Sequence, residues 1–170
     1  MQLRHKSMPR GELLALAHEL RSLVRGALFV VNDHVDIALL SGADGVHLGP
    51  DDLSIAGARR VAGDGLLIGA SASTVDAARQ AFDAGADYIG CGPAFATPVK
   101  ARKAVIGPAG IAAVTEALRP APVFAIGGIN ASNLDQLIAA GIARVCVIRA
   151  VSDAVDPEAA TRRLHAMLAR

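Results

Sequence analysis

The sequence predicts a parallel α/β fold of the TIM (β/α)₈-barrel type, built as a single domain over residues 1–170. Short aliphatic runs alternate with helical patterns along the whole chain, and such alternation is typical of βαβ repeats on a parallel sheet. Hydrophobic residues make up 52% of the chain but aromatic residues only 3%, which suits aliphatic strands under closely packed helices. Polar residues follow nearly every aliphatic run, and in a barrel these positions meet at one rim.

The strands are predicted from continuous aliphatic runs, which fit strands buried on both faces. In chain order they lie at 2–6, 28–31, 45–48, 66–69, 88–90, 123–126 and 145–148. The first of them is the most polar, since Gln2, Arg4 and Lys6 alternate with other residues there.

The helices are predicted from apolar residues spaced three and four apart, as Leu13, Leu16 and Leu20 are in the first of them. In chain order they lie at 12–24, 35–40, 55–61, 75–84, 110–117, 132–140 and 157–168. A glycine follows three of these helices, at Gly42, Gly85 and Gly141. Glycine at that position supplies the left-handed residue that ends a helix.

These patterns make about seven βα repeats, whereas a closed barrel has eight and typically ~250 residues. We therefore expect a barrel that lacks its first β-strand and α-helix. The competing architecture is a doubly wound open sheet, but no G-x-G-x-x-G motif follows the first strand. Open edges at Gln2 and Val145 would expose unpaired backbone groups. For that reason we expect a homo-oligomer.

Composition excludes several classes of function. The net charge is +1 and no basic run occurs, so nucleic acid is not an expected partner. No apolar stretch is long enough to span a membrane, and there is no signal-peptide pattern. Cys91 and Cys146 lack the spacing of a metal site, and we expect both to be buried, reduced thiols. These properties predict a cytoplasmic enzyme.

The polar residues at the strand ends are the candidate site. If Gln2, Arg4 and Lys6 alternate along a strand, they share one face and could grip a diphosphate; the alternative is an exposed, frayed terminus. Asn32-Asp33 and Asp51-Asp52 follow successive strands. Their carboxylates suit Mg²⁺ that is shared with substrate phosphates, although Asp at such junctions also caps helices.

Later strand ends add further candidates. Ser71 could bind substrate or cap the helix that starts near Val75. The long segment from Gly92 to about Gly107 has the length of a functional loop. Gly127-Gly128 would allow backbone N–H groups to approach a ligand, although close packing explains the pair equally well. His47 is interpreted as a residue of the barrel wall and not as a ligand.

Taken in order, these segments resemble the thiamine-phosphate synthase family. The resemblance covers essentially the whole chain from Gln2 onward. Its most specific segments are Gln2–Lys6, Val31–Asp33, Gly45–Gly49, Gly92–Lys100 and Ala125–Ile129. The family implies a (β/α)₈ barrel and a transferase that releases diphosphate. Its reaction joins 4-amino-2-methyl-5-(diphosphooxymethyl)pyrimidine, here called the pyrimidine diphosphate, to a thiazole ethyl phosphate and gives thiamine phosphate.

The resemblance also implies a role for each matching residue. It assigns the pyrimidine diphosphate to Gln2, Arg4, Lys6, Asn32, Ser71 and Lys100, and among these it gives Lys100, Ser71 and Arg4 catalytic roles. It places Mg²⁺ on Asp33 and Asp52. It assigns the thiazole phosphate to Thr97, Gly128, Ile148 and Arg149.

Three residues depart from the family pattern. His5 replaces a glutamate, Pro50 a glutamine, and Arg149 a serine that normally faces the thiazole phosphate. Two alternatives therefore stay open: a thiazole tautomerase-like isomerase, and a non-catalytic binding protein for thiamine precursors. The isomerase carries a catalytic histidine where this chain has Gly92-Pro93. The retained charged residues favour the synthase.

Overall fold

The computed structural model describes residues 1–97 and 104–169 of the chain. The predicted catalytic residue Lys100 lies outside the described residues. The chain divides into two compact units. The first unit comprises Met1–Ser71 and Gln80–Tyr88, and the second comprises Ala72–Arg79 and Ile89–Arg170.

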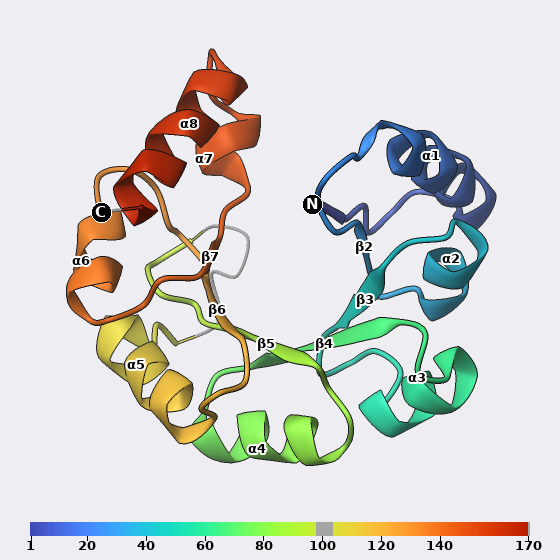
Figure 1. Ribbon diagram of the computed structural model, residues 1–170, viewed down its shortest axis with the longest axis horizontal. Coiled ribbons are helices and arrows are strands. Elements are labelled where there is room, and N and C mark those ends of the chain that lie inside the picture. The colour runs from blue at the N-terminus through green and yellow to red at the C-terminus, as the bar shows by residue number, and fades with distance from the viewer. Residues whose placement is uncertain (98–103, 170) are drawn as a thin grey trace. The chain divides into compact units, whose positions relative to one another are not determined.

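The first unit consists of parallel strands and the helices that follow them (Figure 1). Its strands are β1 (Gln2–Leu3), β2 (Val30–Asn32), β3 (Gly45–Leu48) and β4 (Leu67–Ala72). Its helices are α1 (Arg10–Leu23), α2 (Val35–Leu40) and α3 (Ile55–Ala62). Helix α4 (Val75–Asp83) crosses the division between the units.

The second unit repeats the pattern of parallel strands and helices. Its strands are β5 (Tyr88–Cys91), whose first residue, Tyr88, still belongs to the first unit, β6 (Val123–Ile126) and β7 (Val145–Cys146). Its helices are α5 (Gly107–Ala117), α6 (Leu134–Ala139), α7 (Arg149–Ser152) and α8 (Pro157–Leu168). Among the described residues, no helix has the length and apolarity needed to cross a membrane.

The described strands are parallel and are ordered as they occur in the chain. A doubly wound sheet would reverse its strand order at a switch point. The parallel α/β architecture predicted from the sequence is therefore confirmed, and the doubly wound alternative is wrong.

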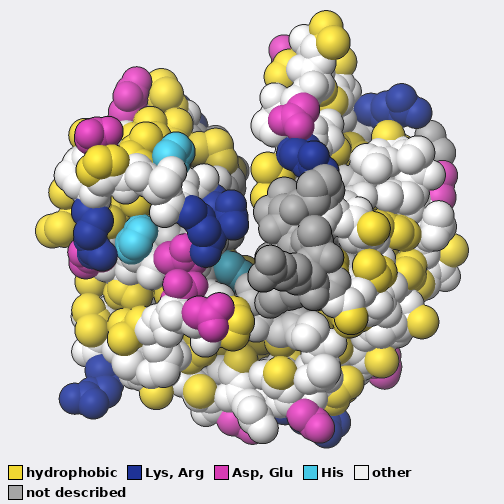
Figure 2. Space-filling model, turned by 180° about the vertical axis from the view of Figure 1, so that it is seen from behind, with side chains coloured by type: hydrophobic (Ala, Val, Ile, Leu, Met, Phe, Trp, Pro, Cys, Tyr) yellow, Lys and Arg dark blue, Asp and Glu magenta, His cyan; other side chains and the backbone are white. Residues whose placement is uncertain are grey.

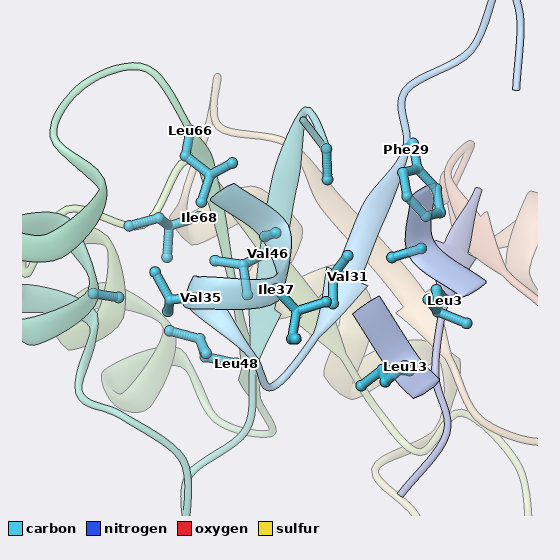
Figure 3. Packing of buried hydrophobic residues seen from close by; sticks show 14 residues of the cluster. Leu3, Leu13, Phe29, Val31, Val35, Ile37, Val46, Leu48, Leu66 and Ile68 are labelled. Atoms are coloured by element: carbon cyan, nitrogen blue, oxygen red, sulfur yellow. The ribbon is translucent and has the colours of Figure 1, made fainter. Parts of the chain in front are cut away.

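Strand register separates an apolar face from a polar face in the first unit. Leu3 pairs with Val31, Val31 with Val46, and Val46 with Ile68, and this row is buried in the hydrophobic core (Figure 3). Because side chains alternate along a strand, the neighbouring row of Asn32, His47 and Gly69 faces the other side. Polar residues at the ends of these strands are thereby directed away from the helices.

Two of the repeated helix-to-strand junctions contain an aspartate that links a strand to a helix. Asp44 accepts hydrogen bonds from the Phe29 backbone N–H at 2.7 Å and from Arg21 at 2.8 Å. Asp87 repeats this arrangement, with bonds of 2.7 Å from both the Ile68 N–H and Arg59. Each carboxylate satisfies a backbone donor near the start of a strand and fixes the position of a helix through its arginine.

The predicted first strand is too long. Strand β1 ends at Leu3, so the prediction that Gln2, Arg4 and Lys6 share one strand face is wrong. The partner strand β2 ends at Asn32, and the next residue, Asp33, has a φ of +67°. Leu3 pairs with Val31, and the pairing of β1 with β2 ends there, one residue before the end of β2.

Other element boundaries shift by a few residues. Strand β7 ends at Cys146 and not at Ile148, and the unpredicted short helix α7 begins at Arg149. Helix α5 starts at Gly107, three residues earlier than predicted. Cys91 is buried as expected, but Cys146 is only half-buried. Both are free thiols.

Candidate active site

Four polar candidates of the first unit lie at or just after the carboxyl ends of β2, β3 and β4. Asn32 is the last residue of β2, and Asp33 comes directly after it. Asp52 lies four residues after β3, and Ser71 lies at the end of β4. Parallel strands bring their carboxyl ends to the same edge of a sheet. The structure thus brings four of the residues predicted for the pyrimidine diphosphate and Mg²⁺ to one edge of one unit.

Asp33 is held beside a cation. Its carboxylate lies 3.2 Å from the Lys6 ammonium, and the aspartate side chain is only 16% exposed. Its positive φ is unique among the described non-glycine residues, and aspartate tolerates this conformation better than most residues. Figure 2 shows basic, acidic and histidine side chains close together on one face of the first unit.

Asp52 is held by the backbone. Its Oδ2 accepts a hydrogen bond of 2.7 Å from the Gly49 N–H in the turn after β3. Asp51, in contrast, is exposed. This hydrogen bond holds Oδ2 of Asp52, and the other carboxylate oxygen, Oδ1, takes no part in it.

Helix capping does not explain these candidates. Ser54 caps α3, with its hydroxyl accepting from the Gly57 N–H at 3.1 Å. Thr74 accepts from the Ala77 N–H at 3.2 Å, and His34 occupies the N-cap of α2. N-capping of the following helices therefore does not account for the presence of Asp33, Asp52 and Ser71 at these positions.

Ser71 belongs to a partly buried network that sequence reasoning missed. Its Oγ lies 3.0 Å from Nε2 of His47, and the other ring nitrogen of His47 lies 3.2 Å from the Tyr88 hydroxyl. The predicted position of His47 in the sheet is confirmed, since it lies in β3 and is buried at 8% exposure. Its two hydroxyl partners, Ser71 and Tyr88, are distant from it in sequence. The strand register that pairs His47 with Gly69 is the signal that could have indicated them, because Ser71 lies two residues beyond Gly69 on the same strand.

A cavity of about 180 Å³ lies in the first unit, and Asp52 and Ser71 are among its lining residues. Ligand pockets for molecules of drug size are usually about 300–1,000 Å³. This cavity alone is therefore too small for a whole pyrimidine diphosphate.

In the second unit, the glycine pair after β6 packs against the loop after β5. The Phe95 N–H donates to the Gly127 carbonyl at 3.0 Å, and the Ala94 N–H to the Ile126 carbonyl at 2.8 Å. A side chain on Gly128 would approach the Phe95 and Ala96 carbonyl oxygens to 2.8 and 2.7 Å. Close backbone packing is therefore one cause of Gly127-Gly128, and it also fixes the loop that leads to Thr97.

The remaining residues predicted for the thiazole phosphate belong to the second unit. Thr97 and Gly128 are half-buried, whereas Ile148 and Arg149 are exposed at the start of α7. Within the described residues, no ion pair joins Arg149 to Asp153. Asp153 instead accepts a hydrogen bond of 2.8 Å from the Ser152 hydroxyl.

The comparisons with known proteins agree along almost the whole chain. The family model described as thiamine monophosphate synthase matches residues 1–151. The chain belongs to the thiamine-phosphate synthase family. It is 47% identical to the thiamine-phosphate synthase of Anaeromyxobacter dehalogenans over 98% of this chain and 75% of that protein.

Two further relatives agree with this assignment. The thiamine-phosphate synthase of Chlorobium luteolum is 48% identical over 99% of this chain and 80% of that protein. The solved structure of thiamine phosphate pyrophosphorylase from Pyrococcus furiosus superposes with a TM-score of 0.91 at 40% identity, over 99% of this chain and 81% of that one. The chain is therefore similar to these transferases in both sequence and structure.

Proposed function

We propose that this chain condenses the pyrimidine diphosphate with a thiazole ethyl phosphate, giving thiamine phosphate and diphosphate. The observation that carries the proposal is the 47% identity to a thiamine-phosphate synthase over 98% of the chain. The separation of the candidate residues supports it, because most of the diphosphate candidates lie in the first unit and all four thiazole phosphate candidates lie in the second.

Gln2, Arg4, Lys6, Asn32 and Ser71 are proposed to bind the pyrimidine diphosphate, together with Lys100. Arg4 and Lys6 supply positive charge, and Asn32 and Ser71 supply hydrogen-bond donors. An electron-rich aminopyrimidine can stabilise a methylene cation. The protein then has mainly to neutralise the departing diphosphate and orient the thiazole nitrogen, which requires no protein nucleophile.

Asp33 and Asp52 have the chemistry of a magnesium site that is completed by substrate. Mg²⁺ is usually held by one or two carboxylates together with phosphate oxygens. No cluster of three or more metal-binding side chains occurs among the described residues, so a site made by protein alone is not proposed. Mg²⁺ bound there would supply Lewis-acid neutralisation of the leaving group.

Thr97, Gly128, Ile148 and Arg149 are proposed to bind the thiazole phosphate. Arg149 is exposed and has no ion-pair partner among the described residues. A guanidinium can bind phosphate with two parallel hydrogen bonds. A role in phosphate binding is therefore favoured over obstruction of the pocket.

The finer structural predictions remain proposals as well. We propose that the fold is of the (β/α)₈-barrel type, in keeping with the strand order. A homo-oligomer and a cytoplasmic location stay predictions. Sedimentation of the purified chain would test the first, and a stable monomer would contradict it.

Adjacent aspartates provide a test of the proposed reaction. The chain is expected to release diphosphate and form thiamine phosphate only when both substrates and Mg²⁺ are present. Asp52→Asn should lower kcat about 100-fold or more, since metal coordination of the leaving group contributes several kcal/mol. The exposed neighbour provides the control, and Asp51→Asn should leave kcat within about twofold.

Other outcomes would identify the alternatives. Isomerisation of a thiazole substrate without use of the pyrimidine diphosphate would replace the synthase with the tautomerase-like function. Calorimetric binding of thiamine phosphate without turnover would indicate a binding protein. Full activity of Asp52→Asn in EDTA would refute the metal assignment alone.

A further inference from the structure

His47 bridges two hydroxyl groups from different strands. Its ring lies on β3, Ser71 lies on β4, and Tyr88 begins β5. Nε2 is 3.0 Å from the Ser71 Oγ, and Nδ1 is 3.2 Å from the Tyr88 hydroxyl. The rings of His47 and Tyr88 stand with centroids 5.5 Å apart and planes tilted by 31°. Both nitrogens of this buried imidazole are thus engaged by hydroxyls.

A glycine makes room for this arrangement. Gly69 pairs with His47 across β3 and β4, and a side chain at Gly69 would overlap the ring and hydroxyl of Tyr88. The absence of a side chain at this position allows the Tyr88 ring to lie against β4 with its hydroxyl near the imidazole. The contact between the imidazole and the Tyr88 hydroxyl therefore depends on three residues, His47, Gly69 and Tyr88.

The direction of the hydrogen bonds follows from what Ser71 must do. A neutral imidazole has one N–H donor and one acceptor nitrogen, so each hydroxyl either donates to the ring or accepts from it. A diphosphate offers only acceptors. For the Ser71 O–H to be directed at that anion, Ser71 must accept from Nε2–H, and Nδ1 must then accept from the Tyr88 hydroxyl.

We infer that Tyr88 and His47 are positioning residues that form a directional relay. Tyr88 donates to Nδ1 and holds His47 in its Nε2–H tautomer, and His47 donates to Ser71 and turns the serine hydroxyl hydrogen toward the pyrimidine diphosphate. The inference rests on the proposed function through the role of Ser71, and it adds two residues that do not themselves touch the substrate. A hydroxyl oriented before the substrate arrives needs no reorganisation when charge develops on the leaving group.

The tautomer can be measured without any substrate. In the chain labelled with ¹⁵N-histidine, the signals of His47 are assigned by their loss in His47→Gln. We expect the Nε2 shift of a protonated nitrogen and the Nδ1 shift of an acceptor. Tyr88→Phe should weaken this preference while preserving the ring. A resting enzyme with the Nδ1–H tautomer at His47 would overturn the relay.

The second arm measures binding of inorganic diphosphate with Mg²⁺ by calorimetry. Tyr88→Phe should weaken binding about tenfold, the scale of one hydrogen bond to a charged group. Ser71→Ala should weaken it at least as much, and the double variant should lose nothing further because both changes remove the same oriented donor. The exposed Ser73 provides the matched control, since Ser73→Ala should bind diphosphate as the unchanged chain does.

Variants of His47 provide a second comparison that does not depend on Tyr88. Glutamine can present an N–H near the position of Nε2, whereas the shorter asparagine cannot reach it. His47→Gln should therefore retain more diphosphate affinity than His47→Asn at similar thermal stability. Equal losses in the two, or additive losses in Tyr88→Phe and Ser71→Ala, would overturn the relay even in an active enzyme. Absence of turnover with the expected tautomer and coupled losses would overturn the proposed reaction alone.

Discussion

The two units place their proposed site residues by different means. In the first unit the contacts involve side chains: Lys6 pairs with Asp33, His47 contacts Ser71, and Asp52 accepts from a backbone N–H. In the second unit the loop after β5 and the glycines after β6 pack backbone against backbone. Substitutions of these site residues in the first unit should therefore change chemistry more than stability. In the second unit, changes of shape should cost stability first.

The largest expected effect on stability comes from a glycine that packs against the backbone of another strand. A side chain at Gly92 would overlap the Ile126 carbonyl oxygen, whereas a side chain at Gly69 would meet the Tyr88 ring. A backbone group cannot move aside as a side chain can. Gly92→Ala should therefore destabilise the chain by about 3 kcal/mol, which lowers Tm by about 6–12 °C. Thermal unfolding followed by circular dichroism checks this.

A series of three Gly→Ala variants separates the effect of a collision with the backbone from the general effect of replacing a glycine. Gly11 of α1 has open space around it, so Gly11→Ala should leave Tm unchanged or slightly raised. Gly69→Ala should lower Tm less than Gly92→Ala does but should weaken diphosphate binding. An equal loss of Tm at Gly69 and Gly92 would contradict the contrast between the units.

Junction aspartates give the next largest effect. Asp87 satisfies the Ile68 N–H and pairs with Arg59, while Ala143 of the second unit stands at the corresponding place after Gly141. Asp87→Ala should cost about 2 kcal/mol of unfolding free energy, because a backbone donor and a guanidinium lose their acceptor. Chemical denaturation measures it. The exposed Asp64 is the control, and Asp64→Ala should change the unfolding free energy by less than about 0.5 kcal/mol.

The sequence predicted the order of elements because aliphatic runs and helical spacing are local properties. It failed where tertiary pairing decides the outcome. Arg4 looked like a strand residue, but the pairing of β1 with β2 ends at Leu3 and Val31. Ser71 and Thr74 were equally suitable as helix caps by residue type, and the structure gives the capping bond to Thr74. Boundaries of this kind depend on a partner that local sequence does not contain.

The site was predicted in part. Asn32, Asp33, Asp52 and Ser71 lie at or just after strand ends, which is a signal available in the sequence. Tyr88 gave no such signal, because its contact with His47 depends on the space above Gly69. Residues that act through another side chain are specified by three-dimensional packing and not by their position after a strand.

Arg149 tests the second unit with a smaller effect. If its guanidinium binds the thiazole phosphate, Arg149→Ser should raise the KM for that substrate about tenfold, the scale of a charged hydrogen bond. The KM for the pyrimidine diphosphate should not change. Steady-state kinetics with each substrate varied separately checks this. Increased turnover would indicate that Arg149 obstructs the pocket, and no change would end the binding proposal.

The smallest expected effect comes from a thiol reagent, which probes the second unit alone because both cysteines lie in its strands. Burial raises the pKa of Cys91 to about 11. The thiolate is the reactive form, so at pH 8 only about one in 1,000 Cys91 side chains would be reactive even if they were accessible. Cys146 is half-buried. Iodoacetamide should therefore modify the native chain at Cys146 first and leave Cys91 intact, as peptide mass spectrometry would show.

The control is the chain unfolded in denaturant, which should be labelled at both cysteines. Equal labelling rates for both cysteines in the native chain would mean that β5 is exposed by local opening. The backbone packing of the second unit would then be weaker than its contacts indicate.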